Sequence, residues 1–356
     1  MKIIIIGAYG FTGQLICKEL IKSNLHFDVC GRNAIKINQL IELFELKKHP
    51  LLIGDIKNKN FTHQLIKQYD IFVNCAGPYN EESNFFLKTI AESGKIYLDL
   101  SGEVSFIKSS FDKYHLIAQS NHSTIIHGCA FESLPFDLLA QKYITKPVKN
   151  IFTFYWFNKH LVSPGTRITM KLAQYYDLYK INNSEWQLIS KNDLCFKTFI
   201  NNEPYRTVNY PLPEIPFFKW NYQPNKAQSF LWLPKNEVNY IKERNGMSKT
   251  KEETYLRLQK RKKRGPLLTE RKAHFSKLIL DVTFKDDTKL QLGLSNIDMY
   301  QTTALSIALS LIQILQTKNL PKGVVNPAKL FLNKEHETLN ALNCKKLDDT
   351  FLIETC

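Results

Sequence analysis

The stretch Met1-Lys-Ile-Ile-Ile-Ile-Gly7-Ala-Tyr-Gly10-Phe-Thr-Gly13 decides the fold, because its three glycines follow an apolar run and precede a helical pattern. Glycines at a strand-to-helix turn let the backbone approach a pyrophosphate, which then rests on the N-terminus of the helix. The sequence therefore predicts a dinucleotide-binding turn. Its expected cofactor-binding residues are Gly7, Tyr9, Gly10, Phe11, Thr12 and Gly13.

The next apolar strand ends in Cys30-Gly31-Arg32-Asn33. Sites specific for NAD usually place an acid about 20 residues beyond the glycines, where it bonds the ribose 2′-hydroxyl. Here Gly31 leaves that place open, and Arg32 offers a planar, permanently charged group that suits a phosphate. We predict NADP as the cofactor, with Arg32 at the 2′-phosphate and Asn33 beside it. The alternative is a solvated arginine in a loop.

Helical and strand patterns alternate along the first 145 residues. Helical spacing at 13–22 and 35–44 alternates with short apolar runs at 50–53, 70–75, 96–100 and 123–127. Such alternation predicts an α/β fold with a doubly wound parallel sheet of the Rossmann type. Ligands of such sheets lie outside the carboxyl ends of the strands. We therefore expect Asp55 at the adenine, and further cofactor contacts from Cys75, Ala76, Gly77 and Pro78.

Three residues at these strand ends are candidates for catalysis: Tyr79, Glu132 and Asp137. Hydride transfer usually needs an acid that protonates the product. Each candidate has a structural alternative, since Tyr79 can pack in its loop, Asp137 can favour a helix N-terminus and Glu132 can serve as a buried acceptor. Glu103 is a further carboxylate at a strand end, placed either to line the cleft or to hold its loop through hydrogen bonds.

Five ordered motifs resemble the saccharopine dehydrogenase-like oxidoreductase family, and most closely its branch of trans-acting enoyl reductases. They are Gly-Ala-Tyr-Gly-Phe-Thr-Gly13, Gly31-Arg32, Asn74-Cys-Ala-Gly-Pro-Tyr79, Tyr97-Leu-Asp-Leu-Ser-Gly-Glu103 and Phe131-Glu-Ser-Leu-Pro-Phe-Asp137. The resemblance implies an NADPH-dependent oxidoreductase that reduces an unsaturated or carbonyl-bearing acyl substrate of lipid metabolism.

The chain also departs from the family pattern. The family usually has a glycine near Ser83, and Gly-Phe-Asp where this chain has Ala130-Phe131-Glu132. These departures leave open a catalytically inactive, NADP-binding regulatory or scaffold protein. An amino-acid dehydrogenase of the saccharopine type is a weaker alternative, because the second half shows no cluster of arginines for two carboxylates.

At 356 residues the chain is long enough for two hydrophobic cores. We predict an NADP-binding Rossmann domain at 1–145 and an α+β substrate or dimerisation domain at 146–297. The segment 298–356 is expected to form a C-terminal helix and tail that pack back on the Rossmann domain. Its apolar part, 303–315, is shorter than the ~20 residues of a membrane span and indicates a buried helix between the domains.

Composition bounds the partners and the compartment. The formal net charge is +15, and the run Lys260-Arg-Lys-Lys-Arg264 suits an anionic membrane, an acyl carrier or a solvated loop. No nucleic-acid recognition module accompanies it. Seven scattered cysteines without C-x-x-C and nine histidines without ligand spacing argue against a disulfide frame and a metal.

We therefore expect a cytoplasmic protein. The alternative that stays open is a peripheral location at the inner face of a membrane. Because the first predicted strand follows Met1 directly, we expect no signal peptide. The expected partners are a free or carrier-bound acyl substrate and a second copy in a homodimer.

Overall fold

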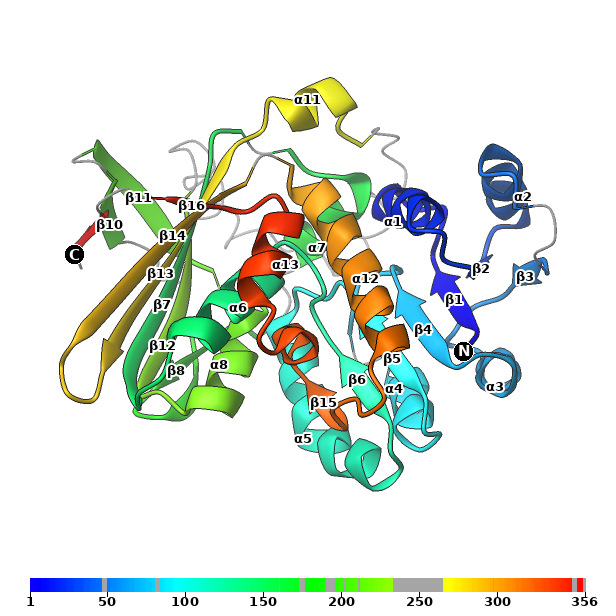
Figure 1. Ribbon diagram of the computed structural model, residues 1–356, viewed down its shortest axis with the longest axis horizontal. Helices are drawn as coiled ribbons and strands as arrows, with labels where there is room; N and C mark the ends of the chain where they lie inside the picture. Colours follow the sequence, from blue (N-terminus) through cyan, green and yellow to red (C-terminus); the bar gives the residue numbers. More distant parts are fainter. Residues whose placement is uncertain are drawn as a thin grey trace, which may run out of the picture. The chain divides into compact units, whose positions relative to one another are not determined.

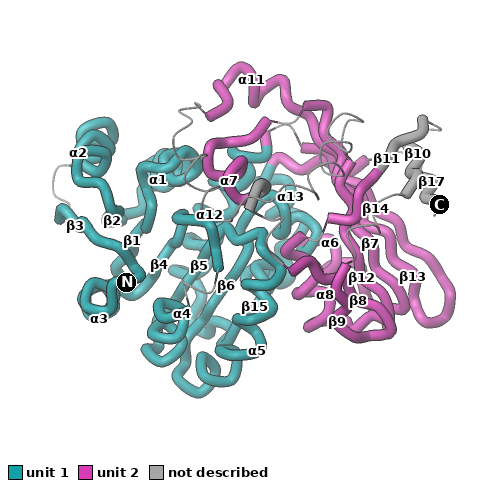
Figure 2. The backbone as a smooth tube through the Cα atoms, turned by 180° about the vertical axis from the view of Figure 1, so that it is seen from behind, with its two compact units in different colours: residues 1–137, 299–342 teal, residues 138–298, 343–356 magenta. Residues whose placement is uncertain are grey.

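The structure is a computed structural model that describes residues 1–46, 50–80, 84–159, 161–172, 177–189, 196–200, 203–210, 212–232, 265–296, 298–347 and 351–354 (Figure 1). The chain divides into two compact units (Figure 2). The first comprises Met1–Asp137 and Met299–Leu342, and the second Leu138–Asp298 and Asn343–Cys356. The basic run at 260–264 and Ser83 lie outside the described residues.

The first unit contains a seven-stranded sheet in the order β15-β6-β5-β4-β1-β2-β3, and all of its paired strands run parallel. This is the Rossmann strand order, with β15 added beside β6. The predicted doubly wound parallel sheet is thus confirmed. Its strands are β1 (Ile3–Ile6), β2 (Asp28–Gly31), β3 (Leu52–Ile53), β4 (Ile71–Asn74), β5 (Ile96–Asp99), β6 (Thr124–Ile126) and β15 (Gly323–Val325).

Helices follow the strands as the apolar spacing predicts. The four residues of β1 are at most 4% exposed, as expected of a central strand covered on both faces. Helix α1 buries Ile16 and Leu20, four residues apart on one face. The helices of this unit are α1 (Phe11–Lys22), α2 (Ala34–Leu43), α3 (Lys59–Gln68), α4 (Asn84–Ala91), α5 (Val104–Ser120), α12 (Met299–Gln316) and α13 (Glu335–Ala341), with the 3₁₀ turn Pro327–Phe331.

The second unit contains a mixed ten-stranded sheet, confirming the predicted second domain of α and β elements. Strands β7 and β12 pair parallel, and its other paired strands are antiparallel. The strands are β7 (Val148–Phe157), β8 (Tyr179–Asn182), β9 (Glu185–Leu188), β10 (Phe196–Ile200), β11 (Glu203–Asn209), β12 (Lys226–Trp232), β13 (Ser276–Phe284), β14 (Lys289–Asn296), β16 (Lys345–Leu347) and β17 (Phe351–Glu354). Its helices are α7 (Pro164–Leu172), α8 (Glu214–Tyr222) and α11 (Leu268–Lys272), while α6 (Leu134–Tyr143) carries the boundary after Asp137.

The C-terminal part of the chain divides differently from the segment 298–356 expected from the sequence. Helix α12 packs against α1 in the first unit, where the Phe11 and Tyr300 rings lie 5.0 Å apart. Strands β16 and β17 instead pair with β14 and β10 of the second sheet. These main-chain pairings place β16 and β17 in the second sheet and not on the Rossmann domain. Among the described helices, none combines the length and the apolar character that a membrane crossing requires.

Candidate active site

The glycine turn after β1 packs against its own backbone and against the loop after β4. Gly7 has a φ of 75°, and a Cβ at this residue would stand 2.9 Å from the Cβ of Ala76. A Cβ at Gly13 would stand 2.7 Å from the carbonyl oxygens of Gly7 and Ala8. Only glycine fits both places without movement of the main chain, so the turn keeps the tight course that a dinucleotide requires.

Helix α1 begins at this turn with Gly10 as its N-cap, and no side chain caps it. The first N–H groups of an α-helix have no acceptor within the helix. Together with the positive end of the helix dipole, these donors suit an anion. Phe11, Thr12 and Gly13 therefore offer main-chain donors where a pyrophosphate would bind, and this geometry fits a dinucleotide.

The space that Gly31 leaves at the end of β2 is filled from within the chain. The ring of Tyr9 lies directly against Gly31, and a Cβ at Gly31 would collide with Cε1 of that ring. The Nζ of Lys36 lies 5.5 Å from the centre of the same ring. The sequence predicted open space beside Gly31, and this prediction is wrong, because the ring of Tyr9 occupies that space.

Arg32 and Asp55 contact each other just beyond the ends of β2 and β3. Nη1 of Arg32 lies 3.5 Å from Oδ2 of Asp55, and both side chains are exposed by a third or more. Asn33 accepts a 3.0 Å hydrogen bond from the main-chain N–H of Lys36 and so caps α2. The expected contacts of Arg32, Asn33 and Asp55 with the cofactor stay predictions, while their mutual geometry places Asp55 beside the proposed phosphate-binding arginine.

The loop after β4 is fixed beside the glycine turn. Asn74 Oδ1 accepts a 3.0 Å bond from the N–H of Ala76, and its Nδ2 donates to the hydroxyl of Tyr97 at 3.1 Å. The N–H of Cys75 donates to the carbonyl of Ile6 at 2.9 Å. The loop then continues through a cis peptide bond between Gly77 and Pro78. The predicted cofactor residues 75–78 thus lie next to the turn after β1.

Tyr79, the first candidate for catalysis, has its hydroxyl engaged by the main chain. The hydroxyl donates to the carbonyl of Asn74 at 2.8 Å and accepts from the N–H of Leu100 at 3.4 Å. The residue is 6% exposed, and burial, with the charge of Asp99 nearby, raises the pKa of Tyr79 well above its usual value. These contacts favour the structural alternative for Tyr79, and its catalytic role stays a prediction.

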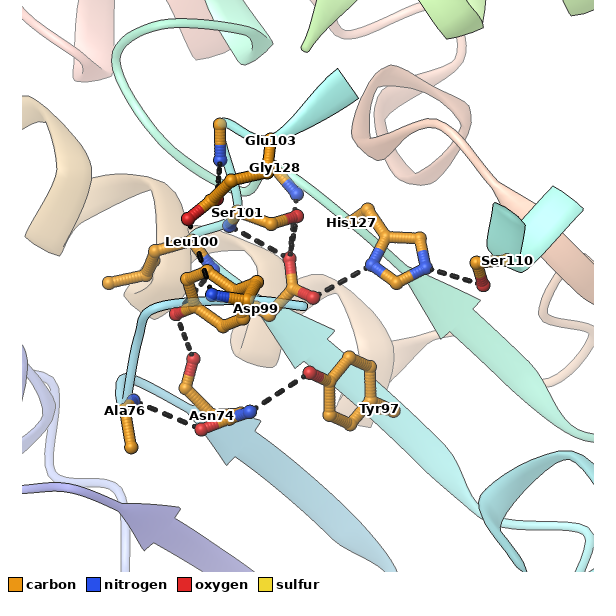
Figure 3. Close-up of polar contacts among 12 residues, drawn as sticks. Asn74, Ala76, Tyr97, Asp99, Leu100, Ser101, Glu103, Ser110, His127 and Gly128 are labelled. Atoms are coloured by element: carbon orange, nitrogen blue, oxygen red, sulfur yellow. Dashed lines mark hydrogen bonds and ion pairs between the residues drawn. The ribbon is translucent and has the colours of Figure 1, made fainter. Parts of the chain in front are cut away.

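A buried polar network joins the carboxyl ends of β5 and β6 (Figure 3). His127 lies between Asp99 and Ser110, with Nδ1 2.7 Å from Asp99 Oδ2 and Nε2 2.7 Å from Ser110 Oγ. The other oxygen of Asp99 accepts from Ser101 N, Ser101 Oγ and Gly128 N. Burial alone would raise the pKa of Asp99, but His127 and these bonds hold it below its usual value.

This arrangement of serine, histidine and aspartate has the order of a nucleophilic triad, yet its members are at most 1% exposed. A nucleophile needs contact with its substrate. The network therefore serves to hold the loops after β5 and β6. Sequence reasoning placed Asn74 and Asp99 in strand-end motifs without giving either a role, and it did not identify Ser110 or His127 as part of the site. His127 directly follows an apolar strand, a signal that could have found it.

Glu103 reaches across the loops after β4 and β5. Its Oε1 accepts from the N–H of Tyr79 at 3.2 Å, and its Oε2 accepts from the N–H of Gly102 at 3.0 Å. The residue is half-buried, directly before α5. Burial raises the pKa of Glu103 to about 7, against the lowering effect of these two N–H donors. An ionisable group therefore stands at this edge with a pKa near neutrality.

The remaining candidates, Glu132 and Asp137, both follow β6. Glu132 is half-buried in the turn before α6, and burial raises its pKa. Asp137 is 2% exposed in the first turn of α6, where a carboxylate complements the helix dipole. Phe131 N donates to Thr303 Oγ1 of α12 at 3.2 Å, which anchors this turn. Among the described residues no group of acids, histidines and cysteines has the arrangement of a metal site.

Comparison with known proteins bears on the first domain. Residues 3–126 match the family described as Saccharopine dehydrogenase NADP binding domain. The human saccharopine dehydrogenase-like oxidoreductase is 31% identical over 152 residues, which cover 38% of this chain and 35% of the human protein. A Mycobacterium tuberculosis protein provisionally named a trans-acting enoyl reductase is 28% identical over 140 residues, covering 38% and 33%. The match thus spans about a third of these relatives.

The fold extends the likeness to the whole chain. The saccharopine dehydrogenase (L-Glu forming) of Saccharomyces cerevisiae superposes with a TM-score of 0.62 over 99% of both chains, at 10% sequence identity. At that identity the likeness concerns the fold alone. The glycine turn, the uncapped α1 and the family match agree with one another, and the predicted family resemblance is confirmed. The first domain of this chain is thus similar to saccharopine dehydrogenase NADP-binding domains, and this match indicates NADP as its cofactor.

Proposed function

We propose that this protein is an NADPH-dependent oxidoreductase that reduces an unsaturated or carbonyl-bearing acyl substrate. One observation carries the proposal: a single edge of the first sheet bears both a dinucleotide turn and an ionisable carboxyl. The turn lies after β1, and Glu103 follows β5, two strands away. Parallel sheets bind their ligands at this carboxyl edge. The same edge can therefore hold a cofactor and act on a substrate beside it.

The residues of the chain divide the work in this proposal. Bound NADPH supplies a hydride from its nicotinamide ring. The donors of α1 hold the pyrophosphate and Arg32 binds the 2′-phosphate. Asn74 and the pair Asp99–His127 fix the loops after β4, β5 and β6 before the substrate arrives, because preorganised groups need no rearrangement during the reaction.

The acyl substrate class is supported by the name of the M. tuberculosis relative, which describes a trans-acting enoyl reductase. We propose an enoyl or ketoacyl thioester related to lipid metabolism, free or bound to a carrier. We also propose a cytoplasmic site of action. The basic run at 260–264 would then contact an anionic membrane or the acyl carrier.

An oxidation assay tests the proposal. Purified protein is mixed with NADPH and with enoyl or ketoacyl thioesters of several chain lengths, and the loss of NADPH absorbance is followed. Parallel reactions contain saccharopine-type amino acids with NADP. Oxidation of NADPH by an acyl thioester is the expected result. Turnover of the amino acids, without turnover of any acyl thioester, would instead support an amino-acid dehydrogenase.

A second candidate function is NADP binding without catalysis, in a regulatory or scaffold protein. The engaged hydroxyl of Tyr79 favours it, because that hydroxyl has two main-chain partners and is buried. Calorimetry separates the two functions. Tight NADPH binding, together with no oxidation by any acyl, aldehyde or keto-acid substrate, would support this second candidate.

A further inference from the structure

The carboxyl edge of the first sheet carries several ionisable groups, and most of them are enclosed. Asp99 and His127 are 0% exposed and paired with each other. The hydroxyl of Tyr79 donates to a main-chain carbonyl. Glu103 differs, since it is half-buried while its side chain lies between the loops after β4 and β5 (Figure 3). It therefore combines a fixed position with incomplete burial of the residue.

Both carboxyl oxygens of Glu103 are held by the main chain. Oε1 accepts from Tyr79 N, and Oε2 accepts from Gly102 N. Each carboxyl oxygen can accept more than one hydrogen bond. These contacts orient the group and still leave it the capacity to carry a proton. Its two donors belong to loops of neighbouring strands, so the position of the carboxyl depends on the pairing of β4 with β5.

We propose that Glu103 is the catalytic acid that delivers a proton to the substrate. This inference rests on the reduction proposed above and names the residue that completes it. Glu103 replaces Tyr79, Glu132 and Asp137 as the first choice, because both of its carboxyl oxygens are held in place between the loops after β4 and β5.

The protonation of Glu103 agrees with this role. Burial raises the pKa of Glu103 to about 7, and the negative charge of Asp99 on β5 acts in the same direction. Among the described residues, Tyr79 in the loop after β4 is a further titratable group that faces it. An acid with a pKa near the working pH is present in both of its forms, which favours proton transfer in each cycle.

The proposed step balances in atoms and electrons. The substrate receives a hydride, with its two electrons, at one end of its C=C or C=O double bond. The π electrons of that bond move to the other end, the α-carbon or the oxygen, and bond the proton that Glu103 gives up. Glu103 is left as a carboxylate and regains a proton from water. NADP⁺ and the reduced acyl compound are the products.

The test compares wild type with Glu103→Gln. Asp112→Asn serves as the matched control, because Asp112 is an exposed carboxylate on α5 that pairs with Lys108 at 2.7 Å. Turnover is measured from pH 5 to 9, and NADPH affinity by calorimetry. We expect Glu103→Gln to lower kcat about 100-fold or more. NADPH affinity should change less than about threefold, as expected for a group outside the cofactor contacts.

Two further readouts separate catalysis from a structural role. The decline of kcat above pH 7 in the wild type should vanish in Glu103→Gln. Formate should partly restore turnover to Glu103→Ala, since it can replace the lost carboxyl. Infrared spectroscopy of the protein alone should show a protonated carboxyl band that declines between pH 5 and 9 in wild type. Glu103→Gln should lose the part of this band that belongs to Glu103 and keep the part that belongs to Glu214.

The outcomes distinguish the two proposals. A wild type that turns over, beside a Glu103→Gln variant within about threefold of it, would overturn the catalytic role alone. Equal losses of turnover, NADPH binding and melting temperature, without rescue by formate, would show that Glu103 only holds the loops. If none of the substrates supports NADPH oxidation by the wild type, both the proposed reduction and the proposed role of Glu103 as its acid would be overturned.

Discussion

At the scale of single residues, the site depends on a few side chains whose types are set by close contacts. Gly7 and Gly13 admit no Cβ, and Gly31 lies directly under Tyr9. The sequence predicted the glycines and Arg32, because a strand followed by glycines and a helix is a local pattern. It could not predict that Tyr9 fills the place beside Gly31, since that contact depends on the path of the turn.

Arg32 should determine the preference for NADPH. Replacing it with Ala removes a charge-assisted contact with the 2′-phosphate, which contributes roughly 1.5–3 kcal/mol. We expect NADPH affinity to fall about tenfold or more, with little change for NADH, which lacks the phosphate. Calorimetry of both cofactors checks this, with Lys22→Ala on α1 as the control. Equal affinities of the native protein for NADPH and NADH would contradict the assignment.

Glu214 should make the free energy of unfolding depend on pH. It is 0% exposed, Thr153 and Ser229 donate to its Oε1, and burial raises its pKa from 4.5 to about 7. Below pH 4.5 both states hold the proton. Between 4.5 and 7 the unfolded chain releases it first, so this stabilisation, about 3 kcal/mol, is lost as pH rises.

Urea unfolding at pH 5 and pH 8 measures this effect. Glu214→Gln removes the titration and keeps an acceptor oxygen, so its stability should fall less between the two pH values than that of wild type. Glu185→Gln, at an exposed position of β9, is the control. An identical pH dependence in Glu214→Gln and wild type would show that the carboxyl of Glu214 does not titrate in this range.

At the scale of elements, helices and strands of the first domain follow from sequence periodicity, whereas the polar network does not. The patterns at 13–22 and 35–44 correspond to α1 and α2. Asp99 and His127 are 28 residues apart and meet because β5 pairs with β6. Only the strand order brings them together, and a single sequence does not contain that information.

Gly13→Ala tests the fit of α1 to the turn. A Cβ at Gly13 would press on two carbonyl oxygens of the main chain, which cannot rotate away as a side chain can. We expect a lower melting temperature and a loss of NADPH affinity of at least tenfold, because the α1 donors would shift. Gly165→Ala is the control, since its Cβ would meet nothing closer than 3.7 Å. Unchanged affinity and stability in Gly13→Ala would contradict the proposed role of the glycine turn and the α1 N-terminus in binding the pyrophosphate.

At the scale of the whole molecule, the chain carries a Rossmann unit and a second unit with a ten-stranded sheet. The sequence predicted two domains from length and from the end of the alternating pattern. It could not place the tail, because β16 and β17 are short strands whose pairing with β14 and β10 is not visible in their own residues. The substrate likewise stays a proposal, since fold does not determine reaction.

The central claim is that this site transfers a hydride from NADPH to an acyl substrate, and isotope transfer tests it most directly. NADPH carrying deuterium at the transferable C4 position is incubated with the protein and the enoyl or ketoacyl thioesters. The product is then examined by mass spectrometry. The proposed function predicts one deuterium on a carbon of the reduced acyl chain. Bound NADPH with no deuterium in any acyl product would contradict it.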